Sequence, residues 1–202
     1  MRPLLILFTK YPRPGEAKTR LIPALGPQGA AQAHRQMVEH CLKRLTDPLS
    51  WDLEVHYGDN TNGQEMASWL GELSLRAQGP GDLGAKMLTS FQEAFARGYQ
   101  RVVLIGSDCP DLDPSYINQA ISALEDHQLV LGPTLDGGYC LIALTGPYSS
   151  LFEQIPWSTD QVLSLTLKIA AEEGINTYCC SELADVDEPQ DLDRFWAHFP
   201  KP

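Results

Sequence analysis

Short apolar runs alternate with segments of helical periodicity along almost the whole of this sequence. Residues Leu4–Thr9, Val102–Ile105 and 129–131 are continuously apolar or nearly so, which is typical of strands that are covered on both faces. Between them, apolar residues recur every three or four positions, as on one side of an amphipathic helix. This alternation predicts an α/β fold, in which helices lie on both faces of a mostly parallel sheet.

Turn residues and periodicity also set the approximate limits of the remaining elements. Pro27 suits a first helical turn, Asp113 suits an N-cap, and Gly174 ends a helical segment. No internal repeat, low-complexity stretch or linker interrupts the pattern, so we expect a single domain over residues 1–202. The predicted helices cover residues 27–47, 64–70, 86–97, 114–124, 160–173 and 189–198, and the further strands cover 53–57, 73–77, 140–144 and 176–180.

Most of the unusual residues stand in loops that follow the predicted strands. These loops come after Thr9, Ala77, Ile105 and Leu131. In an open parallel sheet the carboxyl ends of the strands share one edge, and ligands bind there. We therefore expect the functional site at that edge, built from several of these loops.

The formal net charge of −11 argues against non-specific binding to nucleic acid. The charge is unevenly spread, because the first 20 residues hold five basic side chains and only one acidic side chain. A basic segment in an acidic protein indicates either a local anion-binding site or a solvated loop.

The sequence shows neither a membrane segment nor an export signal. Its longest apolar run, from Leu4 to Phe8, is far too short to cross a bilayer and follows a single arginine. The five cysteines show no C-x-x-C spacing, so neither a structural zinc nor a disulfide framework is indicated. Reduced thiols and a cytoplasmic location fit this pattern best.

The first loop, residues 9–21, combines a glycine turn with Lys10, Lys18 and Arg20. A diphosphate needs several cations and backbone N–H groups on one concave surface, and Gly15 permits close approach of the backbone. The segment has neither the glycines of a P-loop nor G-x-G-x-x-G, so a nicotinamide interpretation is weak. The structural alternative is a Pro-rich connector with scattered surface bases.

Three acidic segments follow the later strands. Asp108 stands directly after a buried strand, where a carboxylate can hold Mg²⁺ or Mn²⁺ but can also simply form a turn. In residues 185–192, helix capping explains the later acidic side chains but does not require both Asp185 and Asp187. Asp136 precedes two glycines, which suits either a tight turn or a close approach of substrate.

Five motifs stand in order along the chain. They are F-x-K-x-P-x-P-G-x-x-K-T-R-L at residues 8–21, G-S-D-C-P-x-L at 106–112, L-G-P-x-x-D-G-G-Y at 131–139, W-S-T at 157–159 and D-V-D-x-P-x-D-L at 185–192. Together they resemble the bacterial arsenosugar-biosynthesis-type glycosyltransferases. That family is related to the molybdenum-cofactor guanylyltransferase and belongs to the GT-A superfamily of nucleotide-diphospho-sugar transferases. The resemblance runs nearly from end to end, with a departure at Cys140, where a second tyrosine is expected.

The resemblance implies a Rossmann-like α/β/α sandwich whose first loop cradles the nucleotide phosphates. It also implies that Asp108 and Asp187 coordinate Mg²⁺ or Mn²⁺, and that the G-D-L-G block at residues 81–84 lies near the nucleoside. The candidate nucleotide-binding residues are Phe8, Lys10, Gly15, Lys18, Arg20, Asp82 and Ser107.

The resemblance favours a glycosyltransferase that moves a sugar from a nucleotide diphosphate to a small-molecule acceptor. Asp108 and Lys18 would act on the departing diphosphate, and Asp136 would position or deprotonate the acceptor. The alternative is a nucleotidyltransferase that couples an NTP to a phosphorylated or acidic acceptor and releases pyrophosphate. Relatives of that kind carry a glycine-rich first loop ending in R-M-G, whereas this loop contains prolines. A third hypothesis, a non-catalytic module that binds a nucleotide or docks a partner, leaves the basic loop and the acidic loops without a role.

Overall fold

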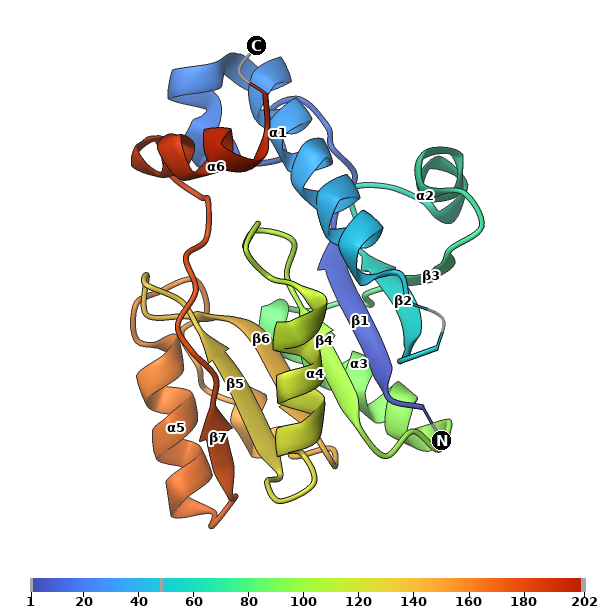
Figure 1. Ribbon diagram of the computed structural model, residues 1–202, viewed down its shortest axis with the longest axis vertical. Coiled ribbons are helices and arrows are strands. Elements are labelled where there is room, and N and C mark those ends of the chain that lie inside the picture. The colour runs from blue at the N-terminus through green and yellow to red at the C-terminus, as the bar shows by residue number, and fades with distance from the viewer. Residues whose placement is uncertain (1, 48, 201–202) are drawn as a thin grey trace.

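The structure, a computed structural model, describes residues 2–47 and 49–200 and contains one seven-stranded sheet. The order of the strands across the sheet is β3-β2-β1-β4-β6-β5-β7 (Figure 1). The strands are β1 (Leu4–Thr9), β2 (Asp52–Tyr57), β3 (Ser74–Ala77), β4 (Val102–Ile105), β5 (Leu129–Pro133), β6 (Tyr139–Leu144) and β7 (Thr177–Cys179). The predicted α/β fold with a mostly parallel sheet is therefore confirmed.

Only β6 runs against its two neighbours in the sheet, β4 and β5. Residues 134–138 alone join β5 to β6, and this connection is far shorter than the dozen or more residues that a parallel crossover needs. The two strands therefore form a hairpin, and its turn contains the Asp136 segment. The other strand pairs are parallel, so the loops after β1, β3, β4 and β5 open at one edge of the sheet, as predicted.

The helices lie close to their predicted positions. α1 (Ile22–Leu45) begins one turn early, but Gly26 interrupts it with a φ of 69°, so regular helix starts at Pro27. The last predicted helix is divided into a 3-10 turn at Pro189–Asp191 and a following α-helix. The remaining helices are α2 (Gly63–Leu70), α3 (Leu83–Ala96), α4 (Pro114–Ala123), α5 (Val162–Glu172) and α6 (Leu192–His198). No helix in the described part of the chain is long and apolar enough to span a membrane.

The central strands are apolar on both faces because helices cover both. In β1, Leu5 and Leu7 belong to a core that includes side chains of α1, α2 and α4. Leu4 and Ile6 point the other way, into a core with side chains of α3 and α5. Figure 1 shows α1 and α4 in front of the sheet and α3 behind it. Because successive side chains of a strand point to opposite faces, a strand that is covered on both faces must be apolar at every position.

A third, smaller core joins the start of α1, with the residue before it, to the C-terminal segment of the chain. Leu21 and Met37 pack there against Val186, Phe195 and Phe199. Accordingly, α6 lies beside the N-terminal half of α1 in Figure 1. This contact holds the first loop next to the late acidic segment, which is the juxtaposition that the predicted site requires.

Candidate active site

Lys18 joins the first loop to the two loops that carry Asp108 and Asp187. Its ammonium Nζ lies 2.9 Å from Asp108 Oδ2 and 3.2 Å from Asp187 Oδ1, and it donates to the carbonyl oxygen of Val186 at 2.6 Å. The residue is only 6% exposed, and its backbone is left-handed, with φ 48° and ψ 49°. A non-glycine residue adopts that conformation at a cost, so the surrounding contacts must hold Lys18 in place.

The Lys18–Asp108 pair is ionised. Burial opposes the charge of Lys18, but the carboxylates of Asp108 and Asp187 outweigh it and raise the pKa of the ammonium above its usual value. For Asp108 the same balance has the opposite direction. Burial works against ionisation, but the Lys18 ammonium, together with His34 and the Ser107 hydroxyl, outweighs it, so the pKa of Asp108 lies below its usual value.

Asp187 also receives a second cation from the first loop. Arg20 forms an ion pair with Asp187 Oδ2 at the surface, while Lys18 holds Oδ1 from inside. The late acidic segment is itself capped, because Asp191 accepts from the backbone N–H groups of Asp187 and Glu188. The loop that carries Asp187 is therefore held by Lys18, by Arg20 and by Asp191.

A first cavity of about 360 Å³ opens beside this cluster. Its wall contains four carboxylates, those of Asp108, Asp136, Asp185 and Asp187, together with the guanidinium of Arg20. The same wall also contains apolar and aromatic side chains, among them Phe8, Tyr139 and Trp157. A cavity lined by both carboxylates and aromatic rings suits a small polar ligand with an apolar face.

A second cavity, of about 380 Å³, lies at the carboxyl ends of β1, β2 and β3. It is lined by Lys10, Lys86 and Ser107 among others. Lys86 lies 3.3 Å from Asp59, whereas the Lys10 ammonium has no hydrogen bond or ion pair within the described residues. Phe8, Leu83, Gly106 and Asp108 line both cavities, so the two meet at Asp108.

Asp136 and the glycines beside it form a turn. Asp136 Oδ1 accepts from the Thr134 hydroxyl at 2.6 Å and from the Gly138 N–H at 3.0 Å. The close approach that we expected at Gly137 comes from the protein itself, because a β-carbon there would collide with the backbone carbonyl of Asp160. The Asp136 side chain nevertheless lines the first cavity, as its predicted role requires.

Asp185 lies near the other carboxylates of the first cavity. Burial, followed by the negative charge of Asp136, raises the pKa of Asp185 to about 6. A carboxyl with such a pKa exchanges a proton near neutral pH, which is a property of catalytic acids and bases. Its sequence signal was the D-V-D spacing, in which Val186 is buried while both flanking carboxylates line the cavity.

Three of the predicted nucleotide-binding residues line neither cavity: Lys18, which is buried against Asp108 and Asp187, Gly15 and Asp82. Gly15 is exposed in a turn with a φ of 89°, which explains the need for glycine there without a ligand. Asp82 is the N-cap of α3 and accepts from the Ala85 N–H at 2.9 Å. In contrast, the other predicted residues line one or both cavities: Phe8, Lys10, Arg20, Ser107, Asp108, Asp136 and Asp187. Lys18 contacts two of them, Asp108 and Asp187, from within the protein.

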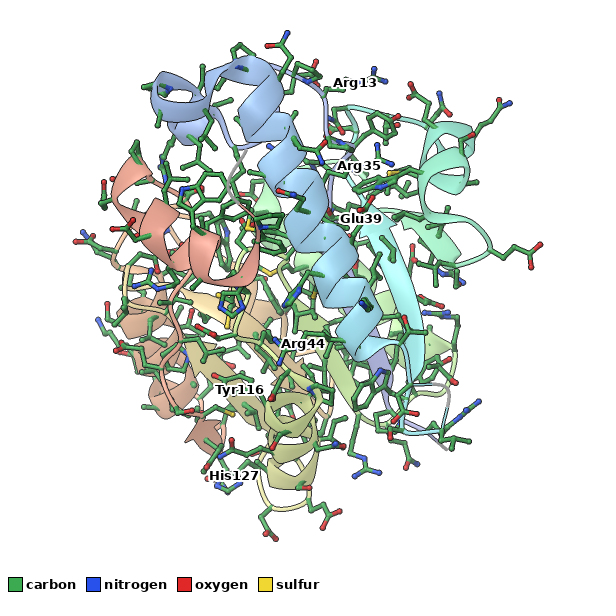
Figure 2. All side chains as sticks on the ribbon, turned by 45° about the horizontal axis from the view of Figure 1, so that its top comes forward. Arg13, Arg35, Glu39, Arg44, Tyr116 and His127 are labelled. Atoms are coloured by element: carbon green, nitrogen blue, oxygen red, sulfur yellow. The ribbon has the colours of Figure 1, made fainter. Side chains whose placement is uncertain are left out.

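Not every basic side chain of the first loop points towards the site. Arg13 forms a two-pronged ion pair with Glu65 of α2, with both N–O distances at 2.7 Å. Figure 2 shows Arg13 at the upper edge of the molecule, on the side where α2 lies. The same side holds Arg35 and Glu39 of α1, and Glu39 accepts from the indole of Trp69. These contacts anchor the loop from outside.

Sequence reasoning missed three residues that shape the second cavity. Lys86 stands one turn into α3, a position that ordinary helix patterning conceals. His34 of α1 lies 3.0 Å from the carbonyl oxygen of Lys10, and burial lowers its pKa, so it is neutral. Gln78 donates to the carbonyls of Thr9 and His56 and so ties the ends of β1 and β2 together. Only the fold brings these three residues to one cavity.

Cys109 and Cys140 both line the first cavity and are buried. A hydrogen bond with Cys140, and then burial, raises the pKa of the Cys109 thiol well above its usual value. A thiol in this state is a packing residue rather than a nucleophile.

The carboxylates of Asp108 and Asp187 suit a divalent cation only in part. Both converge on one point, but no three His, Cys, Asp or Glu side chains of the described chain are grouped so as to hold a metal ion. Mg²⁺ in nucleotide sites takes one or two carboxylates and completes its shell with phosphate oxygens and water. The donor set therefore fits a cation that is shared with a phosphorylated substrate.

The fold is that of the nucleotide-diphospho-sugar transferases. A crystal structure of a Desulfovibrio desulfuricans G20 protein, described provisionally as a nucleotide-diphospho-sugar transferase, matches with a TM-score of 0.91 and 33% sequence identity, covering 97% of this chain and 87% of that one. Residues 41–159 match the family described as "uncharacterized protein conserved in bacteria" (DUF2064), and the chain belongs to this family.

More distant structures share the fold alone. A CMP:2-keto-3-deoxy-manno-octonic acid synthetase complexed with CTP matches with a TM-score of 0.61 and 12% identity, covering 98% of each chain. A cytidylyltransferase from Leptospira borgpetersenii serovar Hardjo-bovis matches with a TM-score of 0.62 and 12% identity, covering 100% of this chain and 89% of that one. No curated protein matches this chain.

Proposed function

We propose that this protein transfers a glycosyl group from a nucleotide-diphosphate sugar to a small-molecule acceptor, with Mg²⁺ or Mn²⁺. The observation that carries the proposal is the meeting of two cavities of different character at Asp108. A transferase needs room for two substrates side by side and fixed charges where they meet. The Lys18 ammonium contacts Asp108 at that junction, and Arg20 lines the first cavity and pairs with Asp187.

The second cavity suits the nucleotide. Lys10 and Lys86 offer ammonium groups to phosphate oxygens, and Ser107 offers a hydroxyl. Because Lys10 has no carboxylate partner within the described residues, its charge is available to a ligand. The volume of about 380 Å³ falls in the range of small-molecule sites.

The first cavity suits the sugar and the acceptor. The rings of Tyr139 and Trp157 offer apolar surface, and the carboxylates offer acceptors for hydroxyl groups. Asp136 would hold the acceptor hydroxyl and take its proton. Asp185, with its pKa of about 6, is a second group that can take this proton.

Asp108 and Asp187 would hold the divalent cation together with oxygens of the diphosphate. When bound, the cation neutralises negative charge on the departing diphosphate. Arg20 would donate to the same diphosphate from the mouth of the first cavity.

We further propose that the chain is a transferase of the arsenosugar-biosynthesis type, because it carries the five motif blocks of that type in order. The alternative, nucleotidyl transfer, would use the same residues. An NTP would then occupy the second cavity, and Lys18 or Arg20 would neutralise the transition state. The prolines of the first loop favour glycosyl transfer.

The test is a thermal-shift screen of nucleotides, UDP-sugars and GDP-sugars with and without Mn²⁺, followed by product analysis of any ligand that stabilises the protein. A ligand that binds the folded state raises the melting temperature by mass action. Glycosyl transfer predicts release of a nucleoside diphosphate, and Asp108→Asn should abolish turnover. Pyrophosphate release from an NTP would instead establish the nucleotidyltransferase alternative, and stabilisation by no nucleotide would overturn both.

Two basic residues of the first loop, Lys10 and Arg13, provide a matched pair of variants. Lys10→Ala should weaken nucleotide binding about tenfold with little change in stability, because a phosphate contact of about 1.4 kcal/mol is lost and no internal ion pair is broken. Arg13→Ala should leave nucleotide affinity nearly unchanged, since its partner is Glu65. Titration of both variants with the nucleotide found in the screen checks this contrast, and equal losses of affinity would contradict it.

A further inference from the structure

The position between the two predicted metal ligands holds a cation that belongs to the chain. The Lys18 ammonium lies 2.9 Å from Asp108 Oδ2 and 3.2 Å from Asp187 Oδ1. A divalent cation that bridged these two oxygens would occupy the same region as the ammonium. Like charges at such a separation repel strongly in a partly buried site.

The remaining carboxylate oxygens also have donors within the protein. Asp108 Oδ1 accepts from the Ser107 hydroxyl at 3.3 Å, and Asp187 Oδ2 pairs with Arg20. Each of the four oxygens therefore contacts a donor of the chain before any ligand arrives. A metal ion alone would have to compete with these donors for the carboxylate oxygens and would bring no new partner for them.

Lys18 is poorly placed to move aside by itself. It is buried, its backbone is fixed in the left-handed region, and it also donates to the Val186 carbonyl. A diphosphate changes this balance, because its oxygens can accept from Lys18 and Arg20 and can complete the shell of the cation. The nucleotide thus supplies what the metal ion lacks.

We propose that Lys18 is a built-in counter-ion that excludes the divalent cation until the nucleotide enters, so that metal and nucleotide bind together. The proposal rests on the proposed function, because it concerns the same two carboxylates. It assigns Lys18 two successive sets of partners: the carboxylates in the free protein and the phosphate oxygens in the complex.

The experiment measures Mn²⁺ binding without nucleotide, from the loss of the EPR signal of free Mn²⁺. Wild type and Asp108→Asn should bind Mn²⁺ equally weakly, since the carboxylate is unavailable in wild type. Lys18→Met keeps the length of the side chain and removes its charge, and it should bind Mn²⁺ at least ten times more tightly than wild type. The double variant Lys18→Met/Asp108→Asn should return to the wild-type level, and the control Lys10→Met should not change.

Two results would overturn the proposal. One is weaker Mn²⁺ binding by Asp108→Asn than by wild type. This comparison does not involve a Lys18 variant, so it tests the proposal even if Lys18→Met fails to fold. The other is a folded Lys18→Met, judged by a cooperative thermal transition, with no gain in Mn²⁺ affinity. Failure of the proposed function is separate, because it shows as the absence of stabilisation by any nucleotide and does not depend on Mn²⁺ binding to the free protein.

Discussion

The D-V-D segment shows how neighbouring residues acquire different tasks. Val186 is buried in the core between α1 and the C-terminal segment, and it fixes the backbone between two acidic side chains. Asp187 pairs with two cations of the first loop, whereas Asp185 lies near the carboxylates of Asp108 and Asp136. The same residue type is therefore held as an anion at one position and pushed towards its neutral form at the other.

Asp185→Asn should stabilise the protein at pH 8 and have little effect at pH 5. The folded-state pKa of about 6 exceeds the unfolded value, so the stability that the neutral carboxyl contributes is complete below about pH 4 and is lost as the pH rises through 6. Because the side chain is only half-buried, we expect a gain of about 1 kcal/mol at pH 8 after allowance for solvent screening. Urea unfolding at both pH values checks this, and a gain that is independent of pH would contradict it.

At the scale of elements, the loop around Trp157 packs so closely on Gly84 and Gly137 that neither position has room for a side chain. The segment around Trp157 packs against the start of α3 at Gly84, and the following backbone packs against Gly137 in the β5–β6 turn. Ser158 between them adopts a left-handed backbone with a φ of 66°. The W-S-T, G-D-L-G and D-G-G blocks are thus parts of one packing arrangement that forms a wall of the first cavity.

Gly84→Ala should destabilise the fold by about 2 kcal/mol, as expected for overpacking. A β-carbon at Gly84 would collide with the Trp157 indole and lie 2.7 Å from the Phe152 carbonyl oxygen. Because Trp157 lines the first cavity, the displaced ring should also change the tryptophan fluorescence and raise the KM for the acceptor. Gly146→Ala is the matched control, because its β-carbon would meet only ordinary contacts at 3.5 Å. Similar effects of the two substitutions in urea unfolding would contradict this account.

At the scale of the whole molecule, the site depends on the junction between the first half of α1 and the C-terminal segment. Leu21 and Met37 on one side and Phe195 and Phe199 on the other are held in one small core. This core has no role in the main sheet, but it brings Lys18 within reach of Asp187. A substitution in this small core should therefore affect both the stability of the fold and the geometry of the site.

Phe195→Ala should cost about 3–5 kcal/mol, as is usual for a fully buried phenylalanine. It should also weaken nucleotide binding well below the unfolding temperature, because the loop that carries Asp187 loses its anchor. Ile117→Ala, in the core under α4, should cost a similar amount without that loss of affinity. Calorimetric titration of both variants at 15 °C separates the two effects, and equal affinities would show that the junction is not needed for the site.

The sequence alone predicted the elements and the edge of the sheet that carries the site. Continuous apolar runs such as Leu4–Thr9 and the helical spacing in α1 are local properties, and they survive in any fold that buries them. The side of the sheet on which the loops open then follows from parallel pairing. The chemistry of the loops was equally visible, because Lys18, Asp108 and Asp187 are conspicuous after short strands.

Only the tertiary structure decided what these residues contact. Arg13 pairs with Glu65, and Asp82 caps α3. Protein atoms fill the space beside Gly84 and Gly137. The Lys18 ammonium lies between two carboxylates. Each of these outcomes is a contact between segments far apart in the chain. Local periodicity carries no information about such contacts, because they are fixed by the packing of the cores and not by the residues on either side.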